Sequence, residues 1–306
     1  MLFLEFKLFF DKMNGYVGGY VMYDVIVLGK GPAGIQAALY IKRASLNVLV
    51  IGKDGGALAK TDKIGNYYGF TQISGPELLE QGYKHAKALD IELIEEEVTG
   101  LSFGLEYTVT TTQNTYLSKA VIIATGSPRA TVKIPNLKEL EGKGVSYCAI
   151  CDAFFYRKKI VGVLGHGDYA AQEAHELVNV ADEVIVFTNG LEPTGQFDPR
   201  VKIIKNRIKN LVGADRLQAV TLDNDSTIEI NGLFIALGSA SATDLALKIG
   251  ALVENNKIIV DEKKQTNVPG LFAAGDCTPG MMQIAKAVGD GCVAGLECIA
   301  YIRNLK

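Results

Sequence analysis

Two segments of this chain each run from a short β-branched strand through a glycine-rich turn into a helix. In the first, Tyr23–Leu28 leads into Gly29-Lys30-Gly31-Pro32-Ala33-Gly34; a helical pattern follows, then a second strand at Asn47–Ile51. The G-x-G-x-x-G glycines permit a tight turn and bring a pyrophosphate close to the N–H groups and dipole at the start of a helix. The strand and helix around the turn favour dinucleotide binding over a chance glycine-rich loop.

The second segment repeats this order later in the chain. Lys159–Leu164 leads into Gly165–Ala170, followed by a helix over Ala171–Val180 and a strand at Val184–Phe187. Further apolar runs end in turns, as buried parallel strands do, and the Thr- and Tyr-rich stretch 106–116 is typical of inserted antiparallel strands. The predicted fold is therefore α/β with two Rossmann-like nucleotide-binding domains. The other runs are Val121–Ile123 before Ala124-Thr125-Gly126, Leu233–Ala236 before Leu237-Gly238, and Gly270–Ala274 before Gly275-Asp276.

Length and charge narrow the functional class. The 306 residues suffice for about two domains, and 31 basic against 34 acidic residues give a net charge of −3. A protein that binds nucleic acid by neutralising phosphates has the opposite balance, so that class is disfavoured. No stretch has the ~20 apolar residues of a membrane helix. We expect residues 1–21 to be an appendage without a role in the fold, since Met22 precedes the first strand pattern.

Two of the five cysteines carry a redox signature. Cys148 and Cys151 are separated by two residues and are followed by Asp152. Such a pair can close a small disulfide, and the neighbouring carboxylate can donate or accept a proton. A zinc site is the alternative, but no second Cys/His pair has ligand spacing, so we expect no metal. An odd number of scattered cysteines is not a secreted disulfide framework, and we expect a cytoplasmic protein.

From about Met22 to Ala300 the chain resembles the low-molecular-weight thioredoxin reductase family. The likeness rests on the order and spacing of the Gly-Pro-Ala-Gly turn, Ala124-Thr125-Gly126, Cys-x-x-Cys-Asp and Gly275-Asp276 with Gln283 after it. It implies a discontinuous FAD-binding domain over 22–131 and 258–306, of the three-layer ββα type. Inserted into it, residues 132–257 would form the central domain with the dithiol. The family is a homodimer that reduces thioredoxin.

The resemblance also implies roles for single residues. Cys148 would attack the disulfide of thioredoxin, Cys151 would face the flavin, and Asp152 would assist proton transfer. Tyr67 and Tyr68 either stack on the flavin or are ordinary core residues. The arginine usual before Gln283 is Met282 here. The implied FAD contacts are Gly29, Gly31, Pro32, Ala33, Gly34, Asn66, Thr125, Gly126, Gly275, Asp276 and Gln283.

The second glycine turn departs from the family pattern. NADPH-dependent members carry a His-Arg-Arg cluster after the following strand, because guanidinium groups grip the 2′-phosphate in a bidentate way. This chain has Phe187-Thr188-Asn189-Gly190-Leu191-Glu192 there, with no arginine before Arg200. Nor is there a strand-end carboxylate for the ribose of NADH. His166 and Tyr169 add bulk within the turn. NAD(P)H binding is therefore predicted to be weak or absent.

This departure resembles the ferredoxin-dependent flavin thioredoxin reductases, which take electrons from reduced ferredoxin. Two alternatives stay open: a thioredoxin reductase that uses NADPH or NADH, and a non-enzymatic flavin and thiol redox sensor. The basic stretch Arg200–Lys209 is either an ordinary solvated strand and loop, a docking surface for an acidic ferredoxin, or a substitute 2′-phosphate site.

Overall fold

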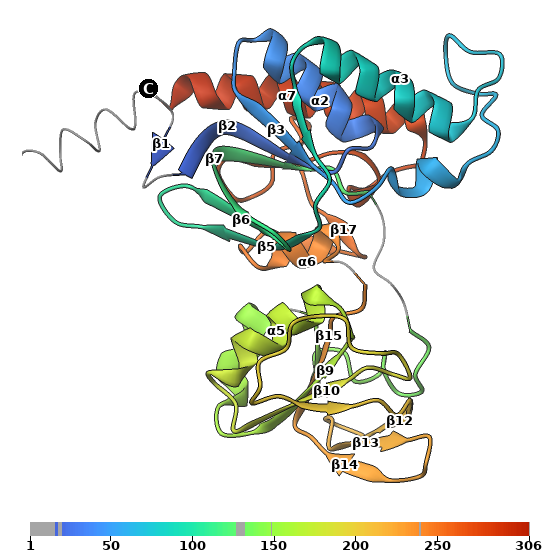
Figure 1. Ribbon diagram of the computed structural model, residues 1–306, viewed down its shortest axis with the longest axis vertical. Coiled ribbons are helices and arrows are strands. Elements are labelled where there is room, and N and C mark those ends of the chain that lie inside the picture. The colour runs from blue at the N-terminus through green and yellow to red at the C-terminus, as the bar shows by residue number, and fades with distance from the viewer. Residues whose placement is uncertain (1–15, 18–19, 127–131, 148, 239, 306) are drawn as a thin grey trace, which may run out of the picture. The chain divides into compact units, whose positions relative to one another are not determined.

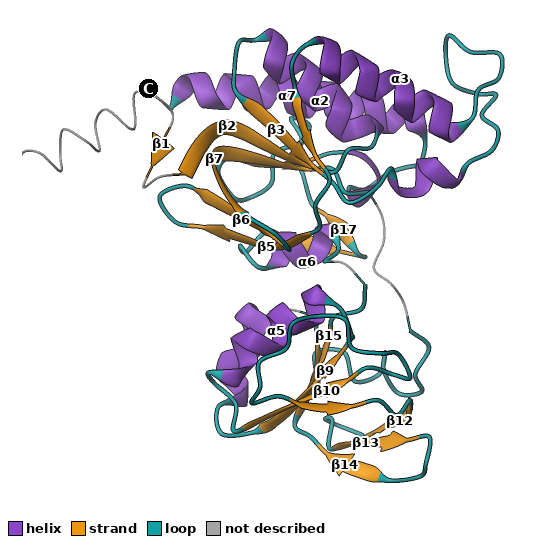
Figure 2. Cartoon of the chain, in the orientation of Figure 1, coloured by secondary structure: helices purple, strands orange, loops and turns teal. Residues whose placement is uncertain are grey.

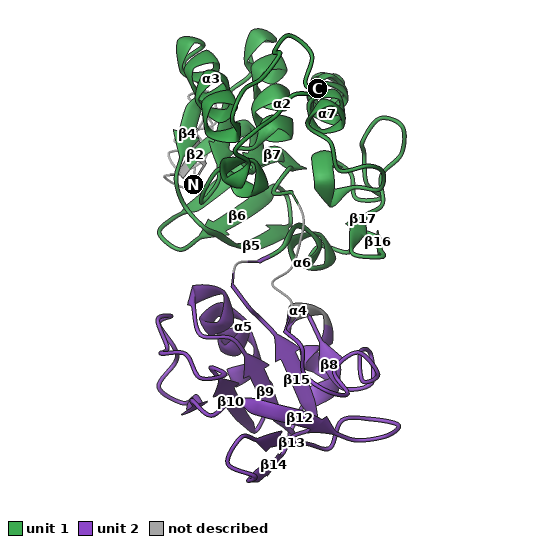
Figure 3. Cartoon of the chain, turned by 90° about the vertical axis from the view of Figure 1, so that its right-hand side faces the viewer, with its two compact units in different colours: residues 1–128, 241–306 green, residues 129–240 purple. Residues whose placement is uncertain are grey.

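The computed structural model describes residues 16–17, 20–126, 132–147, 149–238 and 240–305 (Figure 1). The chain divides into two compact units, residues 1–128 with 241–306 (unit 1) and residues 129–240 (unit 2) (Figure 3). Each unit contains a sheet with parallel strands at its centre and at least one helix on its face, as Figure 2 shows. The prediction of two Rossmann-like domains, the second inserted into the first, is confirmed.

Unit 1 is built on one mixed sheet. Its central part is buried, as in sheets covered on both faces: Val25–Leu28, Val48–Ile51 and Ala120–Ile123 are all buried. The start of β7 (Thr115–Ile123) pairs with β6 (Tyr107–Thr111) in antiparallel fashion, and its end pairs with β18 (Leu271–Ala273) in parallel. The parallel strands in spatial order are β4 (Glu92–Ile94), β3 (Val48–Ile51), β2 (Tyr20–Leu28), β7 (Thr115–Ile123) and β18 (Leu271–Ala273), and β6 (Tyr107–Thr111) and β5 (Val98–Phe103) complete the antiparallel part.

The helices α2 (Pro32–Arg43), α3 (Gly75–Ala88) and α7 (Ile284–Asn304) lie on one face of this sheet (Figure 1). Helix α2 begins with Pro32, which needs no hydrogen-bond partner for its nitrogen there. Its last turn carries Lys42 and Arg43, whose charges interact favourably with the helix dipole. Ser74 and Glu77 form a capping box at the start of α3, and the hydrogen bonds from Ser74 lower the pKa of Glu77. Shorter elements of unit 1 are β1 (Tyr16–Val17), η1 (Gly56–Lys60), α6 (Ala242–Leu247), β16 (Val253–Glu254), β17 (Lys257–Ile258) and η3 (Gly275–Cys277).

Unit 2 holds a parallel sheet and a separate antiparallel one. Helix α5 (Asp168–Val178) begins three residues before the predicted Ala171, with Gly167 as its N-cap. The parallel strands in order are β11 (Lys202–Ile204), β10 (Glu183–Phe187), β9 (Ile160–Leu164), β15 (Gly232–Ile235) and β8 (Val145–Ser146). The remaining elements are α4 (Ala149–Asp152), η2 (Ala153–Tyr156), α5 (Asp168–Val178), β12 (Ile208–Val212), β13 (Ala219–Leu222) and β14 (Thr227–Glu229).

Two sequence boundaries need correction. The second crossing between domains was predicted at 257/258, but residues 241–257 belong to unit 1. The reason is local packing: Lys248 is buried and donates a hydrogen bond to the Thr99 carbonyl of β5 at 3.1 Å. Residues 1–21 were predicted to take no part in the fold, yet β1 pairs with the start of β2 and extends the sheet. Among the described residues, no helix is long and apolar enough to cross a membrane.

Candidate redox-active site

The turn between β2 and α2, residues 29–34, is called the first turn below. Gly29 has φ +111°, and a Cβ added there would lie 2.3 Å from the Ala124 carbonyl oxygen. A Cβ on Gly34 would lie 1.9 Å from the Gly29 carbonyl oxygen. These two glycines are therefore required by the turn and by the approach of the helix to the strand, which are the structural roles of the outer glycines in this motif.

The middle glycine has a different environment. A Cβ on Gly31 would meet no atom within 4 Å, so this position faces open space. Gly31 is also the N-cap of α2, which has no side-chain cap and no acidic residue in its first turn, and Pro32 and Ala33 follow it. Uncapped N–H groups and the positive end of the helix dipole therefore border that space, and this combination attracts an anion.

Gly275 and Asp276 lie beside the first turn. A Cβ on Gly275 would lie 3.0 Å from the Ala33 Cβ, so η3 adjoins the start of α2. The Asp276 side-chain oxygen Oδ1 is buried and has no hydrogen-bond partner among the described residues. An unpartnered buried acceptor costs free energy, so its presence beside the anion-binding turn indicates a ligand that donates to it.

A charged cluster holds this segment in place. Asp290 of α7 accepts hydrogen bonds from the Gly275 backbone N–H and the Thr278 hydroxyl, both at 3.2 Å. It also pairs with Lys264 at 2.8 Å and Lys286 at 2.9 Å. Burial raises the pKa of Asp290, but the two lysines outweigh that effect and the net shift is downward. Asp290 lies between Gly289 and Gly291. No local pattern predicted this positioning role, because three of its partners come from outside α7.

The structure also joins two predicted contact residues that are far apart in the chain. Asn66 donates a hydrogen bond to Gln283 at 3.2 Å, from the loop before α3 to the N-cap of α7. Thr125 is exposed and follows Ala124, which pairs with Leu28 at the end of β2. A Cβ on Gly126 would meet nothing within 4 Å. These residues therefore lie on accessible loops that follow β7 and precede α3 and α7.

The aromatic pair next to Asn66 divides between two environments. Tyr67 packs against the buried cluster of Leu58, Ile64 and Leu79 and stacks on Phe70 with ring centroids 6.4 Å apart. Tyr68 is fully exposed. Tyr67 therefore has the core environment that was the alternative to flavin stacking.

The predicted dithiol belongs to a segment of unit 2, residues 147–152, called the dithiol segment. Cys148 lies outside the described residues; Cys151 belongs to α4, and its side chain is likewise not described. Asp152 accepts a hydrogen bond from the Ser146 hydroxyl at 2.6 Å. Glu173 of α5, whose side chain is buried, accepts from the Ala149 backbone N–H at 2.8 Å. The sequence did not single out Glu173, because nothing local marks a contact 24 residues away.

Comparison with known proteins agrees with this arrangement. Residues 23–291 match the pyridine nucleotide-disulphide oxidoreductase family. Thioredoxin reductases from Listeria innocua and Bacillus subtilis are 35% and 34% identical over 304 residues, which is 93% of this chain and 95% and 96% of theirs. The chain belongs to the thioredoxin reductase family.

Two solved structures of that family bear on the departures in the second turn. The atypical thioredoxin reductase TRi from Desulfovibrio vulgaris Hildenborough is 37% identical, with TM-score 0.86 over 92% of this chain and 98% of that one. A ferredoxin-flavin thioredoxin reductase from Clostridium acetobutylicum is 31% identical, with TM-score 0.68 over 92% and 99%. Both an atypical and a ferredoxin-linked protein are thus among the chain's structural relatives.

FAD is the cofactor expected of a thioredoxin reductase, and unit 1 fits it. The open space at Gly31 and the uncapped start of α2 suit a pyrophosphate. The buried Asp276 Oδ1 is an acceptor for a ribityl hydroxyl. When bound, FAD supplies the ability to pass electrons between a donor and a disulfide.

The turn of unit 2, residues 165–170, is called the second turn. Like the first turn it begins with a glycine after a parallel strand, but its surroundings differ. The backbone N–H groups of Thr194 and Gly195 donate to the His166 carbonyl at 2.8 and 3.0 Å. A Cβ on Gly195 would lie 2.4 Å from the Gly167 carbonyl oxygen and 3.0 Å from the Asp168 backbone nitrogen. The chain's own loop thus lies against the start of α5, where a pyrophosphate would bind.

This loop corrects one detail of the sequence interpretation. Tyr169 was expected to add bulk within the second turn, but its side chain is buried, with 1% of its surface exposed. The exposed Asp168 instead places a carboxylate in the first turn of α5, where it opposes a bound anion. Residues 194–195 gave no sequence signal, because their contact with the turn is made through backbone atoms.

The strand end after β10 is also filled by protein groups. Asn189 accepts a hydrogen bond from the Ile208 backbone N–H at 2.9 Å, and Glu192 pairs with Lys205 at 2.6 Å. The Arg207 side chain packs on Gly190, where an added Cβ would lie 2.7 Å from the Arg207 Nε. Arg207 is thus a guanidinium group close to the place where family members hold a 2′-phosphate.

Most of the basic stretch 200–209 is neutralised within unit 2. Arg200 pairs with Asp198 at 2.8 Å, Lys205 with Glu192 and Lys209 with Asp225 at 2.5 Å. Hydrogen bonds from Arg200 lower the pKa of Asp198 to about 2. This pairing favours the interpretation of an ordinary solvated strand and loop over that of a basic docking surface.

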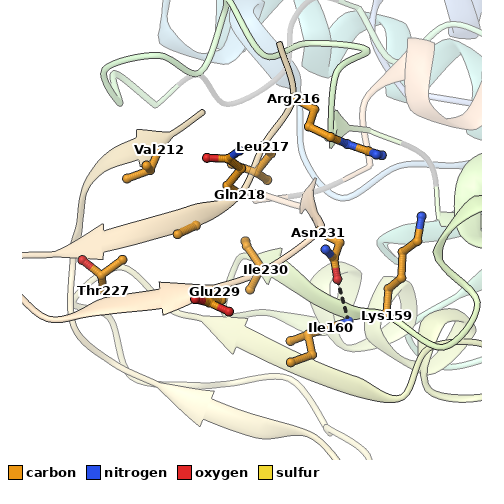
Figure 4. Close-up of a pocket in the computed structure, with 11 residues that line it drawn as sticks. Lys159, Ile160, Val212, Arg216, Leu217, Gln218, Thr227, Glu229, Ile230 and Asn231 are labelled. Atoms are coloured by element: carbon orange, nitrogen blue, oxygen red, sulfur yellow. Dashed lines mark hydrogen bonds between the residues drawn. The ribbon is translucent and has the colours of Figure 1, made fainter. Parts of the chain in front are cut away.

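Two remaining features of the structure stand apart from this chemistry. Cys277, the residue after Asp276, is a buried thiol, and burial raises its pKa to about 12. A cavity of about 510 Å³ in unit 2 lies between β13, β14 and the start of β9, where Asn231 accepts from the Ile160 N–H at 3.2 Å (Figure 4). None of the predicted site residues lines this cavity.

Proposed function

We propose that this chain is an FAD-dependent thioredoxin-disulfide reductase whose electron donor is reduced ferredoxin. Thioredoxin reduction is supported by membership of the family and by the Cys148-x-x-Cys151-Asp152 motif. The donor rests on one observation: residues 194–195 lie against the second turn, while the equivalent surface of the first turn is open. Three features therefore disfavour binding of a nicotinamide nucleotide to unit 2. The second turn is covered by residues 194–195, the first turn of α5 is acidic, and there is no arginine cluster for a 2′-phosphate.

The chain's own residues would act as follows. The first turn and Asp276 would hold FAD, and Glu173 would fix the backbone of the dithiol segment. One thiol of the reduced pair attacks the disulfide of thioredoxin, and the second thiol resolves the mixed disulfide, which leaves thioredoxin reduced and the Cys148–Cys151 disulfide re-formed. Asp152, hydrogen-bonded to Ser146, would exchange the proton at the flavin-side thiol.

An anaerobic stopped-flow experiment tests the donor. Oxidised holoenzyme is mixed separately with NADPH, NADH and reduced ferredoxin, and flavin absorbance and free thiols are followed. We expect bleaching by ferredoxin alone, with thiols appearing afterwards. Rapid bleaching by either nucleotide would return the chain to the nucleotide-dependent reductases.

One observation favours the NADPH alternative, namely the guanidinium of Arg207 beside Gly190. Arg207→Ala in the same experiment separates the two hypotheses. If Arg207 substitutes for the missing 2′-phosphate clamp, the variant loses an NADPH reaction that the parent protein shows. We expect neither protein to react with NADPH.

The order of the thiols and the sensor alternative need separate tests. By resemblance Cys148 attacks, so thioredoxin should be trapped on Cys151→Ser and not on Cys148→Ser. A redox sensor would show no electron transfer from photoreduced flavin through these thiols to thioredoxin. The proposed homodimer is checked by sedimentation at micromolar concentration, where a monomer would contradict it.

A further inference from the structure

Unit 1 lacks one part of the dinucleotide-binding motif. A carboxylate normally stands at the end of the second strand, where it binds the adenosine ribose hydroxyls. Here β3 ends at Ile51 and is followed by Gly52 and Lys53. The nearest carboxylate in the chain, Asp54, accepts a hydrogen bond from the Gly56 backbone N–H at 2.7 Å. A Cβ on Gly52 would lie 2.9 Å from the Lys30 backbone nitrogen and 3.0 Å from its Cγ. Lys30 of the first turn therefore occupies the space next to the strand end that a side chain at position 52 would need.

Lys30 in turn holds a carboxylate from the residue that follows the neighbouring strand, β4. Its Nζ pairs with Glu95 at 2.6 Å, and the Lys30 side chain is only 11% exposed whereas that of Glu95 is 76% exposed. The backbone N–H of Gly52 donates to the Ile94 carbonyl at 3.0 Å, so Glu95 follows β4 directly beside the end of β3. One Glu95 oxygen is bound to Lys30, and the other has no partner among the described residues.

A phenol from α3 adjoins the same place. Lys30 lies over the Tyr83 ring with its Nζ 5.9 Å from the ring centroid. The Tyr83 hydroxyl is buried and has no hydrogen-bond partner within the described part of the chain. Burial, with Glu95 and Asp54 nearby, raises the pKa of Tyr83 to about 12, so this group stays a neutral donor. A Cβ on Gly55 would lie 3.6 Å from this hydroxyl.

We propose that Glu95, held by Lys30, binds the ribose hydroxyls of the adenosine half of FAD in place of the missing strand-end carboxylate, with Tyr83 as a neighbouring donor. The inference rests on FAD as the cofactor of the proposed function. An acceptor, a cation and a donor from three different elements meet at the edge where the motif places the ribose. The carboxylate thus follows β4 and not β3, and Lys30 fixes its position.

A neighbouring pair offers a matched control. Lys53 and Glu97 form a second Lys–Glu pair, also at 2.6 Å, in which the carboxylate stands two positions after Glu95. In this pair the lysine is exposed and the carboxylate is the more covered partner, the reverse of Lys30 and Glu95. Loss of Glu97 therefore removes the same kind of ion pair without removing the exposed carboxylate beside Gly52.

The test is a titration of apoprotein with FAD and with the FAD analogue that lacks the 2′-hydroxyl of adenosine, followed by flavin fluorescence. The parent protein should bind FAD about tenfold more tightly than the analogue, the effect of one hydrogen bond to a charged group. In Glu95→Ala this preference should vanish and FAD affinity should fall about tenfold. Lys30→Met should keep part of the preference, and Glu97→Ala should keep all of it.

Each outcome has a separate meaning. A full preference for FAD over the analogue in Glu95→Ala would overturn the inference. So would a result in which Glu97→Ala loses the preference and Glu95→Ala keeps it. Equal binding of FAD and the analogue by the parent protein would also overturn it. Parent apoprotein that binds neither compound would instead contradict the proposed function, whereas tight FAD binding without the Glu95 effect leaves that function intact. Because Glu95 is exposed, its replacement is compatible with a folded chain, which circular dichroism verifies.

Discussion

The first and second turns are two versions of one motif within the same chain, and they differ mainly in what covers them. Gly31 faces open space, whereas Gly167 has the Thr194 hydroxyl 3.8 Å from the position of an added Cβ. The outer glycines Gly29 and Gly165 are both pressed against a strand-end carbonyl, at 2.3 and 2.1 Å. The first glycine of the motif is therefore required by the fold in both units. The surroundings of the middle glycine instead decide whether a ligand can reach the turn.

This difference separates retention of a fold from retention of its ligand. The strand, turn and helix in unit 2 keep the geometry of a nucleotide-binding domain, because the contacts between its strands build the core of the unit. The start of α5 is instead met by Gly195 and carries Asp168. A glycine motif without its surroundings is thus weak evidence for a bound nucleotide.

The largest expected effect comes from filling the open side of the first turn. Gly31 has φ −79° and ψ −176°, which any residue adopts, so Gly31→Val should fold. Its side chain would take the space of the pyrophosphate and remove at least two charge-assisted hydrogen bonds, about 3–6 kcal/mol in total. We expect FAD affinity to fall by two or more decades, measured by flavin fluorescence with apoprotein.

The equivalent change in unit 2 is the control. Gly167 has φ −98° and ψ −170°, so Gly167→Val meets the same backbone requirement. This variant should retain full flavin content and its reaction with reduced ferredoxin. Loss of FAD from Gly167→Val, or its retention in Gly31→Val, would contradict the assignment of the two turns.

The second effect concerns the ion cluster behind the first turn. Asp290→Asn would leave Lys264 and Lys286 facing each other with no carboxylate between them. We expect unit 1 to lose about 3 kcal/mol of stability at pH 7, the cost of removing one partner from a buried pair. Urea unfolding followed by circular dichroism measures this loss.

The pH dependence of the same cluster follows from the lowered pKa of Asp290. A carboxyl whose pKa is lower in the folded than in the unfolded state stabilises above its ordinary value of 3.8 and loses this effect as pH falls through its folded pKa. The difference between parent and Asp290→Asn should therefore shrink below about pH 4. Asp198→Asn, at a surface pair of unit 2, should change stability little at pH 7.

Much of this organisation could be predicted from local patterns, and the exceptions share a cause. The strands around both turns, the roles of Gly29 and Gly34 and the pairing of domains follow from residue order alone. The return to unit 1 at 241 was missed because it depends on Lys248 reaching Thr99. Glu95, Glu173 and Gly195 were missed for the same reason, since each acts through a contact with a segment distant in the chain.

A third, smaller effect tests the buried acceptor under the dithiol segment. Glu173→Ala would leave the Ala149 N–H without its charged partner, a loss of about 2 kcal/mol. We expect lower stability of unit 2 and slower reduction of thioredoxin, with Glu173→Gln restoring most of both because an oxygen acceptor remains. Glu176→Gln on the same helix should resemble the parent protein. Unchanged turnover in Glu173→Ala would show that this contact does not position the dithiol.

The smallest expected effect separates the two reasons why the second turn is closed to a nucleotide. In Gly195→Ala the new Cβ would lie 2.4 Å from the Gly167 carbonyl, so the loop must move away from the turn. Such overpacking should cost about 1 kcal/mol, whereas Gly167→Ala, with its nearest contact at 3.8 Å, should be almost neutral. Displacing the loop uncovers the start of α5 but leaves Asp168 and Glu192 in place and adds no arginine cluster. We therefore expect Gly195→Ala to remain unreactive with NADPH in stopped-flow mixing. Flavin bleaching by NADPH in this variant would mean that the loop alone, and not the missing charge, excludes the nucleotide.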